Sequence, residues 1–70
     1  MACIRDKIVA LQGQRLWVSG EEAYVTIGKQ VHENNYHTIT EVGDDYFEVT
    51  NPVMNAKWIY AISAVIMIDV

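Results

Sequence analysis

The two histidines of this chain are the side chains best suited to bind a metal ion. His32 and His37 lie five positions apart, and Glu33 follows the first of them. A metal site needs three or four converging ligands, and an odd separation along a strand points two side chains to opposite faces. The spacing therefore predicts exposed polar loop residues, and we expect neither a metal site nor a cofactor.

Cysteine and carboxylate chemistry find equally little support. Cys3 is the only cysteine, so it has no partner for a disulfide within the chain. A nucleophile would need a base beside it, and at this terminal position we expect a small, partly buried thiol instead. The segment Gly43-Asp44-Asp45 is typical of a tight hairpin, which makes solvated acids the expected outcome there. The glycines are scattered singly and form no phosphate-binding loop. The sequence therefore predicts no catalytic residues and a protein that is not an enzyme.

Aromatic side chains offer binding rather than catalysis. Nucleic-acid bases stack on exposed aromatic rings with about 1–3 kcal/mol each, whereas core and interface positions are the common alternative for such residues. We expect Trp17, Phe47 and Trp58 in the core or an interface. The full set is Trp17, Tyr24, Tyr36, Tyr46, Phe47, Trp58 and Tyr60.

The elements that must position these side chains change type after Gly13. Before it, the spacing of Ile4, Ile8 and Leu11 predicts a short amphipathic helix over about residues 3–11. After it, alternating runs predict strands over 15–18, 23–27, 36–42, 46–50 and the long tract 57–70, which is expected to bend at Ser63. The predicted fold is mainly β: a short N-terminal helix, then a small, strongly bent, five- or six-stranded antiparallel barrel over about residues 15–70.

The tract 57–70 is apolar on both of its faces, unlike a strand with one wet side. A second apolar face must also be buried. So short a chain has few other residues that could bury it, so another copy of the same chain is the natural candidate. We expect an edge strand here to pair with a neighbouring chain in a closed homo-oligomeric ring. The predicted interface residues are Trp58, Ile59, Ile62, Val65, Ile66 and Met67.

Length and composition agree with assembly. The chain has 70 residues, 51% of them hydrophobic, and is expected to form one domain over 1–70. Chains of this size bury only about 60% of their unfolded surface and commonly need oligomerisation as reinforcement. A net charge of −4 argues against a general polyanion binder. The N-terminus lacks the apolar run of a secretory signal and the final tract is too short to span a bilayer, so we expect a cytoplasmic protein without a membrane partner.

Two segments resemble the motifs of the Sm-like family, which comprises the Sm and LSm proteins and the bacterial RNA chaperone Hfq. The segment Ile39-Thr40-Glu41-Val42-Gly43-Asp44-Asp45-Tyr46-Phe47-Glu48-Val49 is similar to the first motif, a bent strand, a turn with an acid and an aromatic strand. Tyr60-Ala61-Ile62-Ser63-Ala64-Val65-Ile66 is similar to the second motif, which joins the last two strands. The stretch 23–35 is longer than the family usually has and is expected to be an insertion or an extra hairpin.

The resemblance implies a ring-forming module that binds single-stranded RNA, with Tyr60, Ser63, Tyr46 and Asn51 near the RNA. Hfq-type proteins carry Lys-His directly before the second motif's Ala-Ile-Ser, where this chain has Ile59 and Tyr60. The basic half of the pocket is therefore missing, and we expect weak RNA binding. The alternative is an oligomeric small barrel that serves as a protein-interaction or scaffold module without binding nucleic acid.

Overall fold

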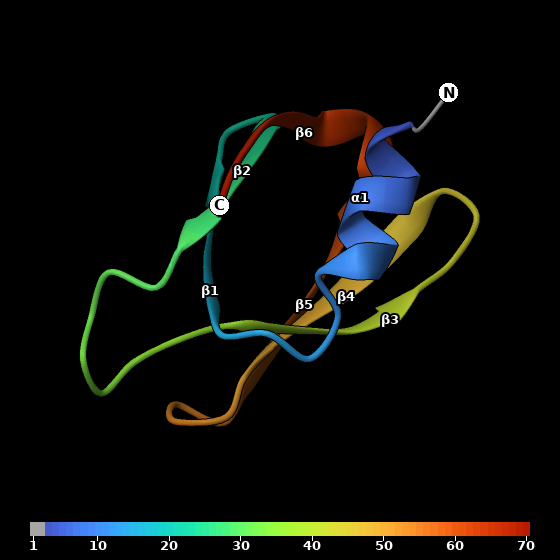
Figure 1. Ribbon diagram of the computed structural model, residues 1–70. Helices are drawn as coiled ribbons and strands as arrows, with labels where there is room; N and C mark the ends of the chain where they lie inside the picture. The colour runs from blue at the N-terminus through green and yellow to red at the C-terminus, as the bar shows by residue number, and fades with distance from the viewer. Residues whose placement is uncertain (1–2) are drawn as a thin grey trace.

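The computed structural model describes residues 3–70 and consists of two three-stranded sheets and one short helix (Figure 1). The helix α1 spans Ile4–Ala10, and a one-turn 3-10 helix, η1, spans Ile62–Ala64. The strands are β1 (Leu16–Glu21), β2 (Tyr24–Lys29), β3 (Thr38–Val42), β4 (Tyr46–Asn51), β5 (Ala56–Ala61) and β6 (Val65–Asp69). The first sheet has the order β1-β2-β6 and the second the order β3-β4-β5. The mainly β class and the six strands agree with the prediction.

Helix α1 lies where the apolar spacing predicted it. Its first turn, however, stays outside the core. Ile8 and Leu11 are buried, but Ile4 is 45% exposed, so the expectation that all three pack inward is wrong for Ile4. The Arg5 Nε donates a hydrogen bond of 2.8 Å to the carbonyl of Gly43 and ties the helix to the second sheet. The helix stops before Gly13, whose φ of 80° is accessible to glycine at little cost.

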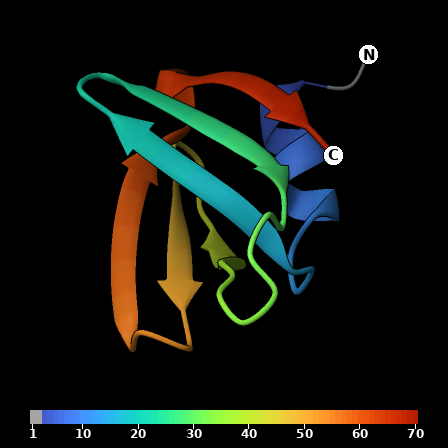
Figure 2. The ribbon, with the colours of Figure 1, turned by 90° about the vertical axis from the view of Figure 1, so that its left-hand side faces the viewer.

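The first sheet combines an antiparallel hairpin with a parallel strand. β1 and β2 pair along their whole length, from Leu16 with Lys29 to Glu21 with Tyr24, and β6 pairs with β2 in parallel. The prediction of a wholly antiparallel barrel is therefore wrong for β6. The bend expected at Ser63 is confirmed as η1, and this turn carries the chain across to β2 instead of back along β5 (Figure 2).

The second sheet is an antiparallel meander. β4 pairs with β3 on one side and with β5 on the other. The predicted hairpin at 43–45 is confirmed, because the Gly43 N–H donates to the Tyr46 carbonyl at 2.8 Å. Along β4, Phe47, Val49 and Asn51 are buried while the residues between them are half-exposed, as expected for a strand with one inward face.

The core lies between the two sheets and under α1. Its members are Ile8, Leu11, Leu16, Val18, Val25, Ile27, Ile39, Phe47, Val49 and Val65. The sheets form an open pair, so the predicted closed barrel is not confirmed. Among residues 3–70, an isolated bridge between Leu16 and His37 joins β1 to the segment before β3. Residues 30–37 form a loop and leave β2 and β3 unpaired with each other.

The stretch 23–35 is not a peripheral insertion in this fold. Its first part is β2, the central strand of the first sheet, which contributes Val25 and Ile27 to the core. Its second part is a loop with a short bridge between His32 and Asn35. None of the helices described in residues 3–70 has the length and apolar character needed to span a membrane.

Candidate functional site

The last two strands each lie at an edge of their sheet and expose large apolar side chains. β5 pairs with β4 on one side and β6 pairs with β2 on one side. Ile59 on β5 is 65% exposed, while Ile66 and Met67 on β6 are 61% and 54% exposed. An exposed apolar edge strand is a template for pairing with another chain. Three of the predicted interface residues are therefore more than half exposed.

The remaining predicted interface residues are more enclosed. Val65 is 5% exposed and belongs to the core, so it is not available as a surface residue. Ile62 is half-buried and packs against the same core. Trp58 is 37% exposed and lies beside His37, with a ring-centroid distance of 5.4 Å. The exposed part of the interface thus concentrates on Ile59, Ile66 and Met67.

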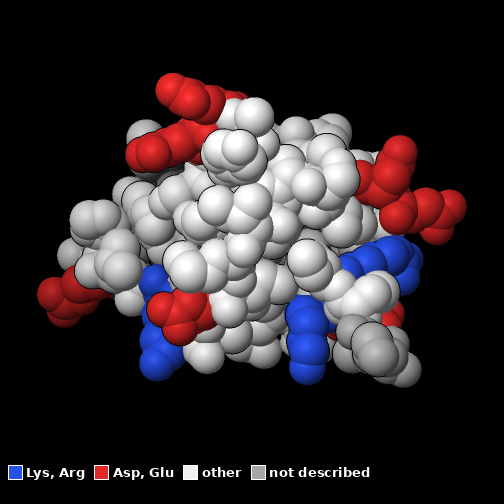
Figure 3. Space-filling model, turned by 90° about the horizontal axis from the view of Figure 1, so that it is seen from above, with Lys and Arg blue, Asp and Glu red and all other residues white. Residues whose placement is uncertain are grey.

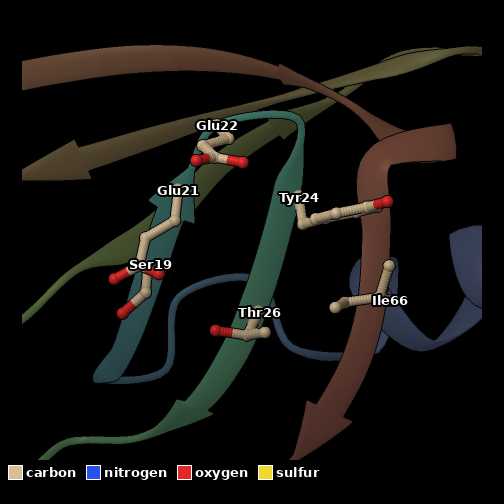
Figure 4. A pocket seen from close by; sticks show the side chains of 6 residues that line it. All are labelled: Ser19, Glu21, Glu22, Tyr24, Thr26 and Ile66. Atoms are coloured by element: carbon tan, nitrogen blue, oxygen red, sulfur yellow. The ribbon is translucent and has the colours of Figure 1, made fainter.

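A shallow hollow of about 670 Å³ lies on the outer side of the first sheet, between the β1–β2 hairpin and β6 (Figure 4). Its lining is Ser19, Glu21, Glu22, Tyr24, Thr26 and Ile66. The Tyr24 side chain extends from β2 toward β6, and Ile66 forms the apolar wall (Figure 4). Glu22 has a φ of 53° at the hairpin turn.

The polar groups of the hollow are hydroxyls and carboxylates. Carboxylates accept hydrogen bonds and attract cations, and hydroxyls both donate and accept hydrogen bonds. The lining can therefore bind a ligand that carries hydrogen-bond donors or positive charge. A neighbouring apolar groove continues the surface along β6, where Trp17, Val31 and Met67 lie with Lys29 and Asp69 at its end.

Charged side chains lie mostly at the rim of the upper side of the molecule. Seen from above, where β6 runs across the molecule, the centre of the surface is uncharged and the Lys, Arg, Asp and Glu side chains lie around it (Figure 3). β6, which runs across this side (Figure 1), exposes the apolar side chains of Ile66 and Met67. Protein–protein interfaces have few charged residues at their centre and polar residues at their rim.

The aromatic residues predicted to meet RNA do not form one pocket. Tyr60 is opposite Phe47 in the β4–β5 register and packs against its ring at 5.8 Å, on the core side of the sheet. Burial raises the pKa of Tyr60. Tyr46 is on the other face, where its hydroxyl donates to Glu41 at 3.3 Å, and the carboxylate of Glu41 raises its pKa. The two tyrosines therefore point away from each other.

Asn51 and Ser63 do not lie together either. Asn51 is 1% exposed, and its Oδ1 accepts hydrogen bonds from the N–H groups of Val53 and Met54 at 3.1 and 3.0 Å. Its Nδ2 donates to Asn35 at 2.7 Å, so the side chain organises two loops. Ser63 is exposed in η1, at the opposite end of β5 from Ala56, the partner of Asn51. Within one chain, the four residues are not brought together.

The histidines lie in contrasting places. His32 is exposed as predicted, but His37 is buried at 6% exposure, which corrects the prediction of two solvent-exposed residues. Trp17 lies between them, with ring-centroid distances of 4.7 Å to His32 and 4.5 Å to His37. The alternation of the sequence carried the signal for His37, because it shares a strand face with buried Ile39 two positions later.

No cluster of three or more potential metal ligands occurs among residues 3–70. Cys3 is exposed. Comparison of the chain with models of protein families, with curated proteins and with solved structures gives no match. The function of the chain must accordingly be argued from its own surface.

Proposed function

We propose that this chain is a homo-oligomeric assembly module, in which β6 of one copy meets an edge strand of the next. The observation that carries the proposal is the exposure of Ile66 and Met67, at 61% and 54%, on a strand that pairs with β2 on one side. An edge strand with such side chains is an aggregation liability unless another chain covers it.

The arrangement of the two last strands favours a second copy as the partner. β5 lies at an edge of the second sheet and β6 at an edge of the first, so each copy offers two different edges with exposed large apolar side chains, besides the edges at β1 and β3. Pairing β5 of one copy with β6 of the next is a heterologous contact, which makes a ring when the rotation closes. Ile59 on β5 would then be covered together with the apolar residues of β6.

Composition supports this reading over a nucleic-acid function. The chain carries nine acids against five Lys and Arg, and binding to phosphates depends on Lys and Arg. The acids Glu41, Asp44, Asp45 and Glu48 lie around Tyr46 on the second sheet and its hairpin, and three of them raise its pKa. The scaffold alternative therefore has more support than the Sm-like RNA-binding one, which stays a weaker expectation.

Light scattering at micromolar concentration tests the proposal. The native chain should show a mass several times the 8.0 kDa of one copy. Ile66→Asp should return the mass to that of a monomer while the circular dichroism spectrum stays β-rich, because the substituted side chain faces solvent in the single copy. A monomeric native chain would contradict the proposal.

Val53→Asp is the matched control for that variant. Val53 is a β-branched residue with 54% exposure, in the turn between β4 and β5 rather than on a strand edge. It should keep the native mass. Loss of assembly in both variants would show that added negative charge, and not the β6 surface, controls association. The absorbance ratio of the purified assembly should show no bound nucleic acid.

A further inference from the structure

His37 lies at the junction of the two sheets, directly before β3. Its backbone N–H donates to the Leu16 carbonyl, and its own carbonyl accepts from the Leu16 N–H, both at 2.8 Å. These two hydrogen bonds attach the start of the second sheet to the outer edge of β1. Tyr60 packs over the core side of β1 further along, because a Cβ added to Gly20 would lie 2.8 Å from the tyrosine Cε1.

The imidazole of His37 supplies a third hydrogen bond to β1. The Val18 N–H donates to His37 Nδ1 at 3.2 Å. A ring nitrogen accepts a hydrogen bond only while it carries no proton. The observed contact therefore requires a neutral imidazole with its proton on Nε2.

The surroundings of the ring favour this neutral form. Trp17 and Trp58 lie edge-on to the imidazole, with centroid distances of 4.5 and 5.4 Å. The residue is 6% exposed, and burial lowers the pKa of His37 below the ordinary value of 6.5. An imidazolium here would be a buried charge without a partner, which is strongly unfavourable.

Ionisable groups on the neighbouring segments do not compensate such a charge. These groups are Arg15, His32, Glu33, Tyr36 and Lys57. Arg15 lies over the Tyr36 ring at 4.7 Å, and Lys57 pairs with Glu48 at 3.7 Å. His32 and Glu33 are exposed, and among residues 3–70 no carboxylate forms an ion pair with His37.

We propose that His37 is a pH-sensitive latch, closed when the imidazole is neutral and opened by its protonation. A proton on Nδ1 would place a donor against the Val18 N–H, so this hydrogen bond would be lost and the two donors would repel. The segment before β3 would then separate from β1. The β1 edge that carries the N–H groups of Leu16 and Val18 would become free.

The direction of the pH effect follows from linkage. The unfolded chain takes up a proton at His37 near pH 6.5, the ordinary pKa, whereas the folded chain resists protonation to a lower pH. The contribution to stability is therefore complete above about pH 6.5 and is lost as the pH falls toward the lowered pKa of the folded state. In that window the unfolding equilibrium constant should rise up to about tenfold per pH unit.

Titration of the native chain by NMR measures the latch directly. The His37 ring signals should titrate below about pH 6.5, and the Val18 amide should lose protection from hydrogen exchange over the same range. Emission of the two tryptophans beside the ring should shift as they become hydrated. A His37 that titrates at or above about 6.5, or a Val18 amide whose exchange protection ignores the titration, would overturn the proposal.

His37→Gln separates titration from the hydrogen bond. Its amide oxygen can accept a hydrogen bond but does not titrate, so the stability of this variant should lose most of its dependence on pH between about 7.5 and 5. His32→Gln is the control, because it removes an exposed histidine on the other side of Trp17. An unchanged pH dependence in His37→Gln would refute the latch. If that variant does not fold, the titration of the native chain decides.

Discussion

The outer faces of the two sheets differ in how their polar side chains are used. On the second sheet, Thr40 Oγ1 donates to Glu48 at 2.7 Å and lies 3.1 Å from Thr50 Oγ1. Lys57 pairs with the same Glu48 at 3.7 Å. These side chains form a connected polar network beside exposed Ile59, and its cross-strand pairs are of the kind that stabilise a sheet in water.

The outer face of the first sheet has no such network. Ser19, Tyr24 and Thr26 form no side-chain hydrogen bond with another described residue, and they lie beside exposed Ile66 and Met67. The polar side chains on the outer face of the second sheet form hydrogen bonds with one another within one copy. The outer face of the first sheet instead exposes apolar side chains and hydroxyls that a partner could contact. The proposed self-association would thus use the β6 edge of the first sheet, together with exposed Ile59 on the β5 edge of the second sheet.

The largest expected effect separates two adjacent residues of β6. Val65→Asp should prevent folding or lower the free energy of unfolding by at least about 4 kcal/mol, because it buries a charge without a partner. Ile66→Asp should leave the single copy folded, since this side chain is exposed. Thermal unfolding followed by circular dichroism distinguishes them. Equal losses in both variants would mean that both faces of β6 are needed within one copy.

A smaller effect compares one threonine on each outer face. Thr40→Ala removes hydrogen bonds to Glu48 and Thr50 and should lower the free energy of unfolding by about 0.5–1.5 kcal/mol. Thr26→Ala removes no side-chain hydrogen bond to another described residue, although both changes lose the same strand propensity. Urea unfolding should be measured in the Ile66→Asp background, so that association does not contribute. A loss at Thr26 as large as that at Thr40 would remove the contrast between the two faces.

The local elements could be predicted from the sequence because they depend on neighbouring residues. Alternation located the strands, Gly43-Asp44-Asp45 located the hairpin, and Ser63 marked the bend before the last strand. The parallel pairing of β6 could not be predicted in this way. It depends on the direction in which a three-residue turn sends the chain, and β-branched residues suit parallel and antiparallel neighbours alike.

Burial at the site was harder to predict than the strands. Two apolar faces on the tract 57–70 correctly indicated exposed apolar residues, but they did not show that Val65 lies in the core while its neighbour Ile66 does not. Polar residue type misled the prediction for His37 and Asn51, which are both buried. His37 Nδ1 accepts a hydrogen bond from the Val18 N–H, and Asn51 Nδ2 donates one to Asn35. These partners lie in distant segments, and a sequence alone does not reveal them.

The smallest expected effect concerns RNA, which the acidic outer face of the second sheet should repel. Short single-stranded RNA should bind no more tightly than micromolar near physiological salt. The dependence on salt should be shallow, because its slope follows the number of neutralised phosphates and the chain has five Lys and Arg. Fluorescence anisotropy with labelled oligo-U and oligo-A measures both quantities.

Tyr60→Ala should weaken any binding, and Tyr60→Phe controls for its packing against Phe47 because it keeps the ring. Nanomolar, strongly salt-dependent binding would show that the basic side chains near α1 and β1 dominate over the acids, and the contrast between the two sheets would then not decide the function.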